Sequence, residues 1–113
     1  TDLLIACIEA AKDLKCPYHV GIARSHDSFY TDREAEIGAC WSTQGVLGAD
    51  METAALFTIA HLRGVKAASI LNNVVAYEQD TAESISSYVD GANLAMQGER
   101  NEILTALEAL HRL

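Results

Sequence analysis

The first third of the chain alternates between helical and extended hydrophobic patterns. In DLLIACIEAAKDLK, residues 2–15, apolar side chains recur three or four positions apart, which predicts an amphipathic helix with Asp2 as its N-cap. The segment CPYHVGIARS, residues 16–25, is rich in β-branched and aromatic residues and predicts a strand after Pro17. The polar run SHDSFYTDREAE, residues 25–36, predicts a loop that leads into a short helix ending near Cys40.

The same alternation continues through the middle of the chain. VLGA, residues 46–49, predicts a brief strand after a turn at Gly45. METAALFTIAHLRG, residues 51–64, is rich in helix formers and predicts a helix with Gly64 as its C-cap. VKAASILNNVVAY, residues 65–77, is almost continuously apolar, as expected for a strand that is buried on both faces of a parallel sheet.

The last part of the chain predicts a polar connection and a closing helix. Residues 78–99 are polar and punctuated by glycine, and predict a loop with some helix. ERNEILTALEALHRL, residues 99–113, predicts an amphipathic helix whose inward side chains are expected to be Ile103, Leu104, Leu107 and Leu110.

Helices and strands alternating in this way predict a layered α/β fold with a mostly parallel sheet. The pattern offers only about three strands, whereas sheets usually have about five or six. The 113 residues are therefore expected to form one small domain region whose sheet is incomplete.

Composition and charge narrow the classes of partner. Eight basic against sixteen acidic residues give a net charge of −8, which argues against non-specific binding to nucleic acid or to an anionic membrane. No apolar run approaches the length of a membrane span, and no signal peptide is apparent. The three cysteines lack metal-ligand spacing and are interpreted as reduced thiols of a cytosolic protein.

Two carboxylates and a methionine stand where the second predicted strand ends and a helix begins. Ligands of α/β sheets lie at the carboxyl ends of strands, and Asp50, Met51 and Glu52 follow such an end. In one interpretation Asp50 caps the helix, Glu52 compensates the helix dipole and Met51 fills a gap. In the other, Glu52 points into a cleft and accepts hydrogen bonds from two neighbouring hydroxyls, such as those of a ribose, while Met51 packs on the sugar.

The loop after the first predicted strand is a second candidate site. Phe29 and Tyr30 stand in a polar run, where an aromatic ring either stacks on a planar ligand or anchors the loop in the core. His26 is a candidate for acid–base chemistry or a solvated side chain, and Ser25, His26 and Asp27 are consecutive, which does not suit a hydrolytic triad. Two asparagines in the apolar run, Asn72 and Asn73, either face the end of the sheet or are structural amides. The sequence has no nucleotide-binding glycine motif and no metalloprotease motif.

These segments together resemble a known family. HVGIARSHDSFY, residues 19–30, and GVLGADMETAALFTIAHLRGVKAASIL, residues 45–71, are similar to the second half of the nucleoside phosphorylases, in the group of the uridine phosphorylases and the hexameric purine nucleoside phosphorylases. The similarity extends over about residues 3–75 and, loosely, the final helix. It implies that Met51 and Glu52 contact the ribose and that Phe29 lines the base pocket.

The resemblance also implies a reaction and a set of partners. The family converts a nucleoside and phosphate reversibly into free base and ribose 1-phosphate, without a metal or organic cofactor. The implied protein is a cytoplasmic pentosyltransferase, a homo-oligomer, with nucleoside and phosphate as its ligands. A nucleosidase, or a nucleoside-binding or structural remnant without turnover, remains an alternative.

The sequence departs from the family in two respects. The family's glycine-rich phosphate loop and phosphate-binding arginines belong to an N-terminal half, so residues 1–113 correspond to the C-terminal portion of a single domain and are expected to be inactive alone. Uridine phosphorylases carry Gln and Arg after Phe-Tyr to read uracil, where this chain has Arg33 and Ala35. In one interpretation Arg33 is solvated or pairs with Asp32 or Glu36. In the other it contacts the base and, because it has only donors, is expected to favour a purine or modified nucleoside over uridine.

Overall fold

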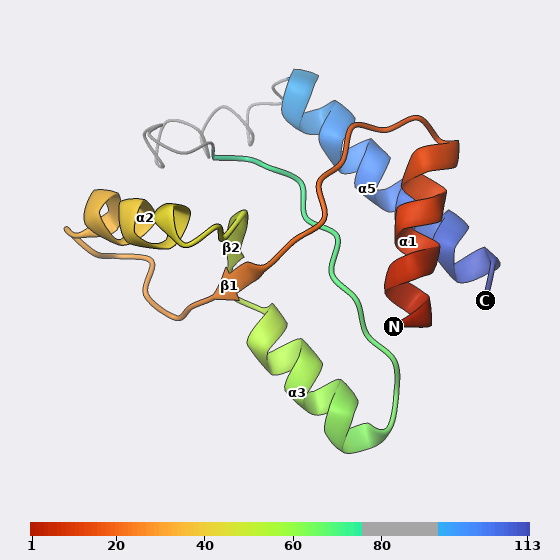
Figure 1. The fold of residues 1–113 in the computed structure, drawn as a ribbon, viewed down its shortest axis with the longest axis horizontal. Helices are drawn as coiled ribbons and strands as arrows, with labels where there is room; N and C mark the ends of the chain where they lie inside the picture. The colour runs from red at the N-terminus through yellow and green to blue at the C-terminus, as the bar shows by residue number, and fades with distance from the viewer. Residues whose placement is uncertain (76–92) are drawn as a thin grey trace. The chain divides into compact units, whose positions relative to one another are not determined.

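The computed structural model describes residues 1–75 and 93–113, which divide into two compact units (Figure 1). One unit contains Thr1–His19 and the chain from Ala68 onward, and the other contains Val20–Ala67. Among the described residues the element order is helix, strand, helix, strand, helix, helix, in which helices and strands alternate up to the third helix. The two strands pair in parallel. The predicted α/β class is confirmed.

The first unit is built on two helices, α1 (Asp2–Asp13) and α5 (Asn93–His111). Small side chains bring them together: Ala10 is 0% exposed on α1 and Ala109 is 1% exposed on α5. Leu3, Ala6 and Cys7 complete this small core, with Ala68 and Ile70 packed against it. Because alanine side chains are short, they touch across the contact only when the two helices approach each other closely.

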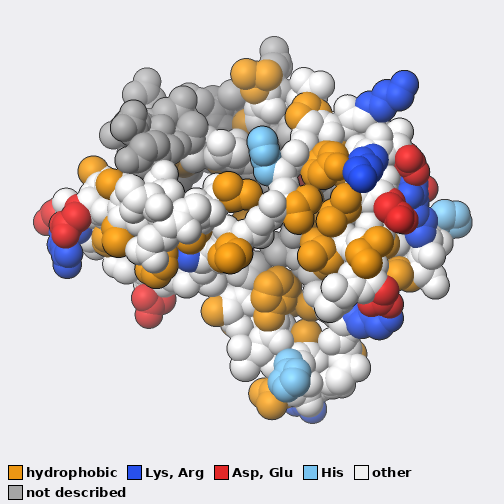
Figure 2. Space-filling view, viewed as in Figure 1, with side chains coloured by type: hydrophobic (Ala, Val, Ile, Leu, Met, Phe, Trp, Pro, Cys, Tyr) orange, Lys and Arg blue, Asp and Glu red, His pale blue; other side chains and the backbone are white. Residues whose placement is uncertain are grey.

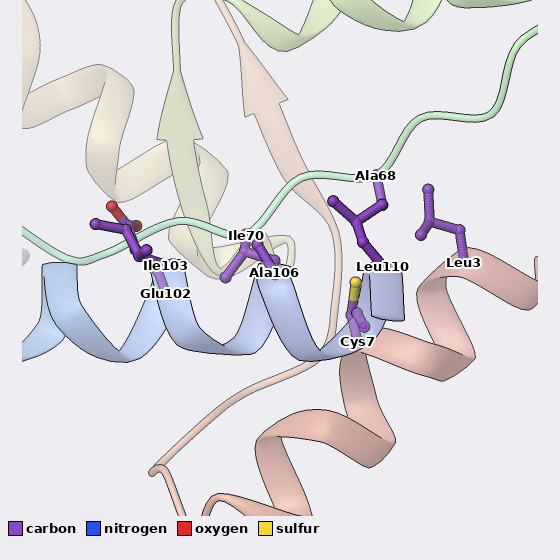
Figure 3. A pocket seen from close by; sticks show the side chains of 9 residues that line it. Leu3, Cys7, Ala68, Ile70, Glu102, Ile103, Ala106 and Leu110 are labelled. Atoms are coloured by element: carbon purple, nitrogen blue, oxygen red, sulfur yellow. The ribbon is translucent and has the colours of Figure 1, made fainter. Parts of the chain in front are cut away.

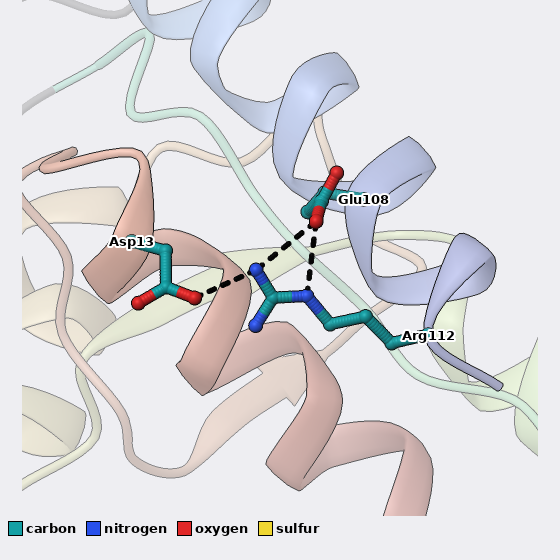
Figure 4. A network of polar contacts seen from close by, with 3 residues as sticks. All are labelled: Asp13, Glu108 and Arg112. Carbon is teal, nitrogen blue, oxygen red and sulfur yellow. Dashed lines mark hydrogen bonds and ion pairs between the residues drawn. The ribbon is translucent and has the colours of Figure 1, made fainter.

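An ion-pair network joins the same two helices at the surface (Figure 4). Arg112 NH2 lies 2.8 Å from Asp13 Oδ2 at the end of α1 and 3.1 Å from Glu108 Oε1 one turn earlier on α5. The Arg112 Nε also donates to Glu108 Oε1 at 3.1 Å. These charge-assisted bonds raise the pKa of Arg112, with the bond to Asp13 as the largest cause.

The extended residues 68–72 lie along α5 and, with α1, line an open apolar groove (Figure 3). Asn72 Nδ2 donates to the carbonyl of Ala95 at 2.9 Å, so this asparagine is a structural amide, which was one of its two interpretations. Gly98 allows this approach, since a Cβ there would overlap the Asn72 side chain. Burial in the groove, together with the charge of Glu99, raises the pKa of Glu102, and the backbone N–H of Asn72 opposes that rise.

The second unit contains a two-stranded parallel sheet and two helices. Strand β1 (Ala23–Ser25) pairs with β2 (Gly48–Asp50) in the register Ala23↔Gly48, Arg24↔Ala49 and Ser25↔Asp50. Helix α2 (Glu34–Thr43) connects them, and α3 (Thr53–Arg63) follows β2. Gly64 ends α3 in the left-handed conformation with φ +66°, which confirms it as the predicted C-cap.

Two expectations about local structure were wrong. Thr1, not Asp2, is the N-cap of α1, and Asp2 Oδ1 accepts instead from the adjacent Leu3 N–H at 3.0 Å. Residues 65–75 contain no strand, because no neighbouring backbone in the described part of the chain forms a ladder with them. The rest of that predicted strand, and residues 78–92 of the predicted loop, lie outside the described residues.

The closing helix also differs from its prediction in extent and in its buried face. It begins at Asn93 rather than near residue 99. Its buried residues are Thr105 and Ala109, whereas the four side chains expected inward are 38–61% exposed: Ile103, Leu104, Leu107 and Leu110. The reason is that α1 offers a face of alanines, which a small side chain on α5 matches and a leucine does not.

Large apolar side chains are exposed on both units, and Figure 2 shows many of them on the viewed face. Helix α3 is the clearest case, because it buries only Ala60. Its larger apolar residues are 45–75% exposed: Leu56, Phe57, Ile59 and Leu62. Among the described residues, no helix is long and apolar enough to cross a membrane.

Candidate functional site

The candidate site lies where the paired strands of the second unit end. The last pair in the ladder is Ser25 with Asp50, and the N–H of His26 donates to the Asp50 carbonyl at 3.0 Å just beyond it. Two connections leave this edge, one toward α2 and one toward α3. Because both strands are parallel, the residues of the two connections start from the same edge of the sheet.

Asp50 organises the connection from β2 to α3. Its Oδ1 accepts from Thr53 Oγ1 at 2.7 Å and from Thr53 N–H at 3.4 Å. Helix α3 formally starts after Glu52, so Asp50 is not the N-cap residue, but its carboxylate performs the predicted capping of the first turn. Burial raises the pKa of Asp50, yet the hydrogen bonds from Thr53, Ser25 and the Glu52 N–H together outweigh burial and hold that pKa below its usual value.

Ser25 joins this network from the other strand. Its hydroxyl accepts from the N–H of Ala54, in the first turn of α3, at 3.1 Å, and contributes to the lowered pKa of Asp50. Ser25 is therefore connected to the end of β2 through the ladder and to the start of α3 through its hydroxyl. The sequence offered Ser25 only as a member of a triad and did not reveal this role, because the link between Ser25 and Ala54 spans 29 positions.

Met51 and Glu52 lie between the Asp50 carboxylate and the first turn of α3. Met51 is 41% exposed, and Glu52 is also exposed. The Glu52 Oε2 accepts from the Met51 N–H at 3.0 Å, which folds the carboxylate back over its own turn. Both side chains are thus accessible at the strand edge while the backbone around them is fixed by Asp50 and Ser25.

The connection from β1 to α2 carries the aromatic candidates. Phe29 and Tyr30 pack edge to face, with ring centroids 5.1 Å apart and planes at 75°. Phe29 is 44% exposed and Tyr30 is 96% exposed, so neither ring anchors the loop in a core. His26 Nδ1 lies 3.1 Å from the Ser28 carbonyl, which orients the ring within the loop.

Arg33 forms a bidentate ion pair with Glu36. Its Nε donates to Glu36 Oε2 at 3.0 Å and its NH2 donates to Glu36 Oε1 at 2.9 Å. The pair raises the pKa of Arg33 and lowers that of Glu36. Both side chains are about two-thirds exposed, so the pair is weak and a competing partner can displace it. This pairing was one of the alternatives for Arg33.

The four candidate ligand residues therefore divide between two connections of one unit. Met51 and Glu52 follow β2, while Phe29 and Arg33 lie between β1 and α2. Within residues 1–75 and 93–113, no three His, Cys, Asp or Glu side chains converge in a way that would hold a metal ion. What the arrangement offers chemically is a carboxylate acceptor beside a thioether, and an exposed aromatic pair that suits a flat ring.

Comparison with known proteins identifies the family. Residues 1–100 match the phosphorylase superfamily. The purine nucleoside phosphorylase DeoD-type of Bacillus subtilis is 42% identical in a match that covers 73% of this chain and 36% of the relative. The guanosine phosphorylase of Halorubrum lacusprofundi is 30% identical in a match that covers 96% of this chain and 46% of the relative.

The crystal structure of uridine phosphorylase from Vibrio fischeri is 45% identical and superposes on 99% of this chain and 44% of its own, with a TM-score of 0.82. The chain thus spans less than half the length of these relatives. The match over most of its residues nevertheless shows that the chain belongs to the phosphorylase superfamily.

Proposed function

We propose that residues 1–113 form the C-terminal, nucleoside-binding portion of a nucleoside phosphorylase, and that the complete domain converts a nucleoside and phosphate into free base and ribose 1-phosphate. The observation that carries the proposal is the turn after β2, which leaves Met51 and Glu52 exposed at the strand edge of a chain 42% identical to a purine nucleoside phosphorylase. The names of the other relatives, a guanosine phosphorylase and a uridine phosphorylase, support the same class of reaction.

Glu52 is proposed to hold the ribose. Its carboxylate can accept from two neighbouring hydroxyls, and a diol presents such a pair. The Met51 N–H donates to Glu52 Oε2 and so orients the carboxylate. This bond does not prevent the carboxylate from binding a diol, because its two oxygens retain further lone pairs that can accept hydrogen bonds. The flexible thioether of Met51 packs on the apolar face of the sugar.

Phe29 and Arg33 are proposed to contact the base. An exposed ring on the loop after β1 supplies a surface on which a nucleobase stacks, and the neighbouring Tyr30 ring braces it edge to face. Arg33 donates to base acceptors once it leaves Glu36, which costs little because the ion pair is exposed.

Catalysis is proposed to need the remaining part of the family's domain. Phosphate must meet a local positive site, since the chain carries a net charge of −8 and repels an anion globally. The exposed apolar residues of α3 support the presence of further protein around this unit, because a helix that is apolar on all sides is normally buried. We further propose that the complete protein is a cytoplasmic homo-oligomer.

A chimera tests the proposal directly. The chain is fused behind the part of the Vibrio fischeri uridine phosphorylase that it does not match, which gives a completed domain. Uridine, inosine and guanosine are incubated with this domain, with and without inorganic phosphate, and free base is measured by liquid chromatography. Base release that requires phosphate is the expected result.

The other outcomes have distinct meanings. Equal base release with and without phosphate would indicate a nucleosidase and contradict the proposed reaction. A folded, oligomeric chimera that releases no base while the parent Vibrio enzyme is active would show that this chain cannot supply the nucleoside-binding part. The chimera with Glu9→Ala, which alters an exposed carboxylate on α1, controls for general effects of charge.

A further inference from the structure

We infer that Ser25 is a positioning residue for the ribose-binding turn: its hydroxyl holds the connection after β2 so that Met51 and Glu52 face the nucleoside. The inference rests on the proposed function, since it assigns Ser25 a role in the same site. Ser25 is not expected to touch the substrate. It acts through its ladder pair with Asp50 and through the backbone of α3.

The contacts of the Ser25 hydroxyl carry the inference. The hydroxyl accepts from the Ala54 N–H at 3.1 Å, which joins the end of β1 to the first turn of α3. Asp50 in turn accepts from the Thr53 hydroxyl at 2.7 Å. Only Met51 and Glu52 lie between the last residue of β2 and the first residue of α3. Before this two-residue link Asp50 pairs with Ser25 in the ladder, and after it the Ala54 N–H is bound to the Ser25 hydroxyl.

The position of Ser25 in the sheet makes this link rigid. Ser25 is the last residue of β1 and pairs in register with Asp50. Its backbone neighbour, His26, also donates to the Asp50 carbonyl at 3.0 Å. The hydroxyl therefore starts from a backbone that the ladder already fixes, which is how a supporting residue holds a ligand-binding side chain within a narrow range of positions.

A purely structural role for Ser25 makes a different prediction from a positioning role. If Ser25 only completes the cap of α3, replacing it would loosen the helix and leave ligand contacts of a folded protein unchanged. If it positions the turn, loss of the hydroxyl should weaken ribose binding in protein that remains folded, and a conservative hydroxyl should restore it.

The first arm of the experiment needs no nucleoside. Amide hydrogen exchange is measured by NMR on the 113-residue chain and on its Ser25→Ala, Ser25→Thr and Thr43→Ala variants. Thr43 is the matched control, because its hydroxyl donates to a backbone carbonyl at 2.7 Å at the end of α2 in the same unit. Exchange at Ala54 and Glu52 should become about three- to tenfold faster in Ser25→Ala and be restored in Ser25→Thr. Unchanged exchange in Ser25→Ala would overturn the inference.

The second arm measures nucleoside binding by the same four proteins. Chemical shifts of the Met51 methyl group and the Glu52 amide are followed during titration with uridine and with inosine. Ser25→Ala should weaken binding about three- to tenfold, while Ser25→Thr and Thr43→Ala remain close to wild type.

Equal affinities of wild type and Ser25→Ala would overturn the positioning role even where the exchange arm succeeds. Equal losses in Ser25→Ala and Ser25→Thr would also overturn it, since the hydroxyl would then not be the active group. A wild-type chain in which neither nucleoside perturbs Met51 or Glu52 would instead contradict the proposed ribose site, while the exchange arm still decides whether Ser25 fixes the turn. The two failures are therefore distinguishable.

Discussion

At the scale of a single residue, the two interpretations of the Asp-Met-Glu run differ in the role of Glu52, which either binds the ribose or only compensates the helix dipole. A carboxylate that accepts from the ribose contributes a charge-assisted pair worth about 1.5–3 kcal/mol. Glu52→Ala in the completed domain is therefore expected to lower kcat/KM for phosphorolysis about ten- to a hundredfold. Steady-state kinetics with inosine and uridine measure this, with Glu9→Ala as the control for loss of an exposed carboxylate.

The alternative for Glu52 is compensation of the helix dipole alone. In that case Glu52→Ala would change the free energy of unfolding by less than about 1 kcal/mol and leave kcat/KM unaltered. Unaltered kinetics would contradict the ribose assignment. Asp50 is a poor choice for this test, because its carboxylate holds the backbone of the turn through Thr53 and its loss would disturb both interpretations.

The hydrogen-bonding groups of Arg33 determine which base we expect the completed domain to prefer. Its guanidinium donates and cannot accept the ring N–H of uracil, whereas a glutamine does both. The ion pair with Glu36 is exposed and offers little resistance to a base. We therefore expect the completed domain to prefer inosine or guanosine to uridine, and Arg33→Gln combined with Ala35→Arg to shift the ratio of kcat/KM toward uridine by about tenfold or more.

The same measurements can refute the base assignment. A kcat/KM for uridine tenfold above both purine nucleosides in the unsubstituted domain would mean that another residue reads uracil. Glu36→Gln provides a matched control, because it releases Arg33 from its ion pair without altering the donors that Arg33 presents. It is expected to leave the preference for purine nucleosides in place.

Local signals explain why Met51 and Glu52 were predictable as candidates and Ser25 was not. The Asp-Met-Glu run lies within one turn of sequence at the boundary of a strand and a helix, so its place at a strand end follows from hydrophobic patterning. The Ser25 bond to Ala54 depends on the register of two strands that are separated by α2. Register of that kind follows from tertiary packing, which periodicity does not encode.

At the scale of the elements, the helices followed from the sequence because their determinants are local. Helix α3 ends at Gly64 as its C-cap signal predicts, and α1 forms where the apolar spacing predicts a helix, although the face that it buries also includes Ala6 and Ala10. The segment at 65–75 was misassigned because a continuous apolar run requires a partner strand to become a strand, and the two described strands pair only with each other. Its extended backbone lies along α5 instead, attached through Asn72.

The contact between α1 and α5 gives a prediction about stability. Ala10 is completely buried where the two helices meet, and inserting a larger side chain there forces them apart. Ala10→Leu is expected to lower the free energy of unfolding by about 1–3 kcal/mol. Ala55→Leu, at an exposed position of α3, should change it by less than about 0.5 kcal/mol.

Urea denaturation monitored by circular dichroism measures both variants. Equal stability of Ala10→Leu and wild type would show that α1 and α5 do not pack through their small residues. The network of Arg112, Asp13 and Glu108 bridges the same helices but is partly exposed to solvent, so it is not expected to compensate for overpacking.

At the scale of the whole molecule, apolar surface and charge lead to the same expectation, that the isolated chain does not catalyse phosphorolysis. The chain leaves large side chains exposed on α3 and an open apolar groove beside α5. Its net charge of −8 opposes the approach of phosphate. Within the described residues, Arg33 is engaged with Glu36, and Arg112 with Asp13 and Glu108.

The isolated 113-residue chain is therefore expected to release no base in a phosphate-dependent reaction, whereas the completed domain does so. The physical reason is that transition-state stabilisation in glycosyl transfer to phosphate depends on preorganised charge around the phosphate, which the proposed ribose-binding turn alone does not provide. Both proteins are assayed with inosine, guanosine and uridine at equal concentrations and with excess phosphate. The completed domain carrying Glu52→Ala serves as the reference for residual activity. Phosphate-dependent turnover by the isolated chain above that reference would show that these residues contain a phosphate site of their own, and that the remaining part of the domain is not needed for catalysis.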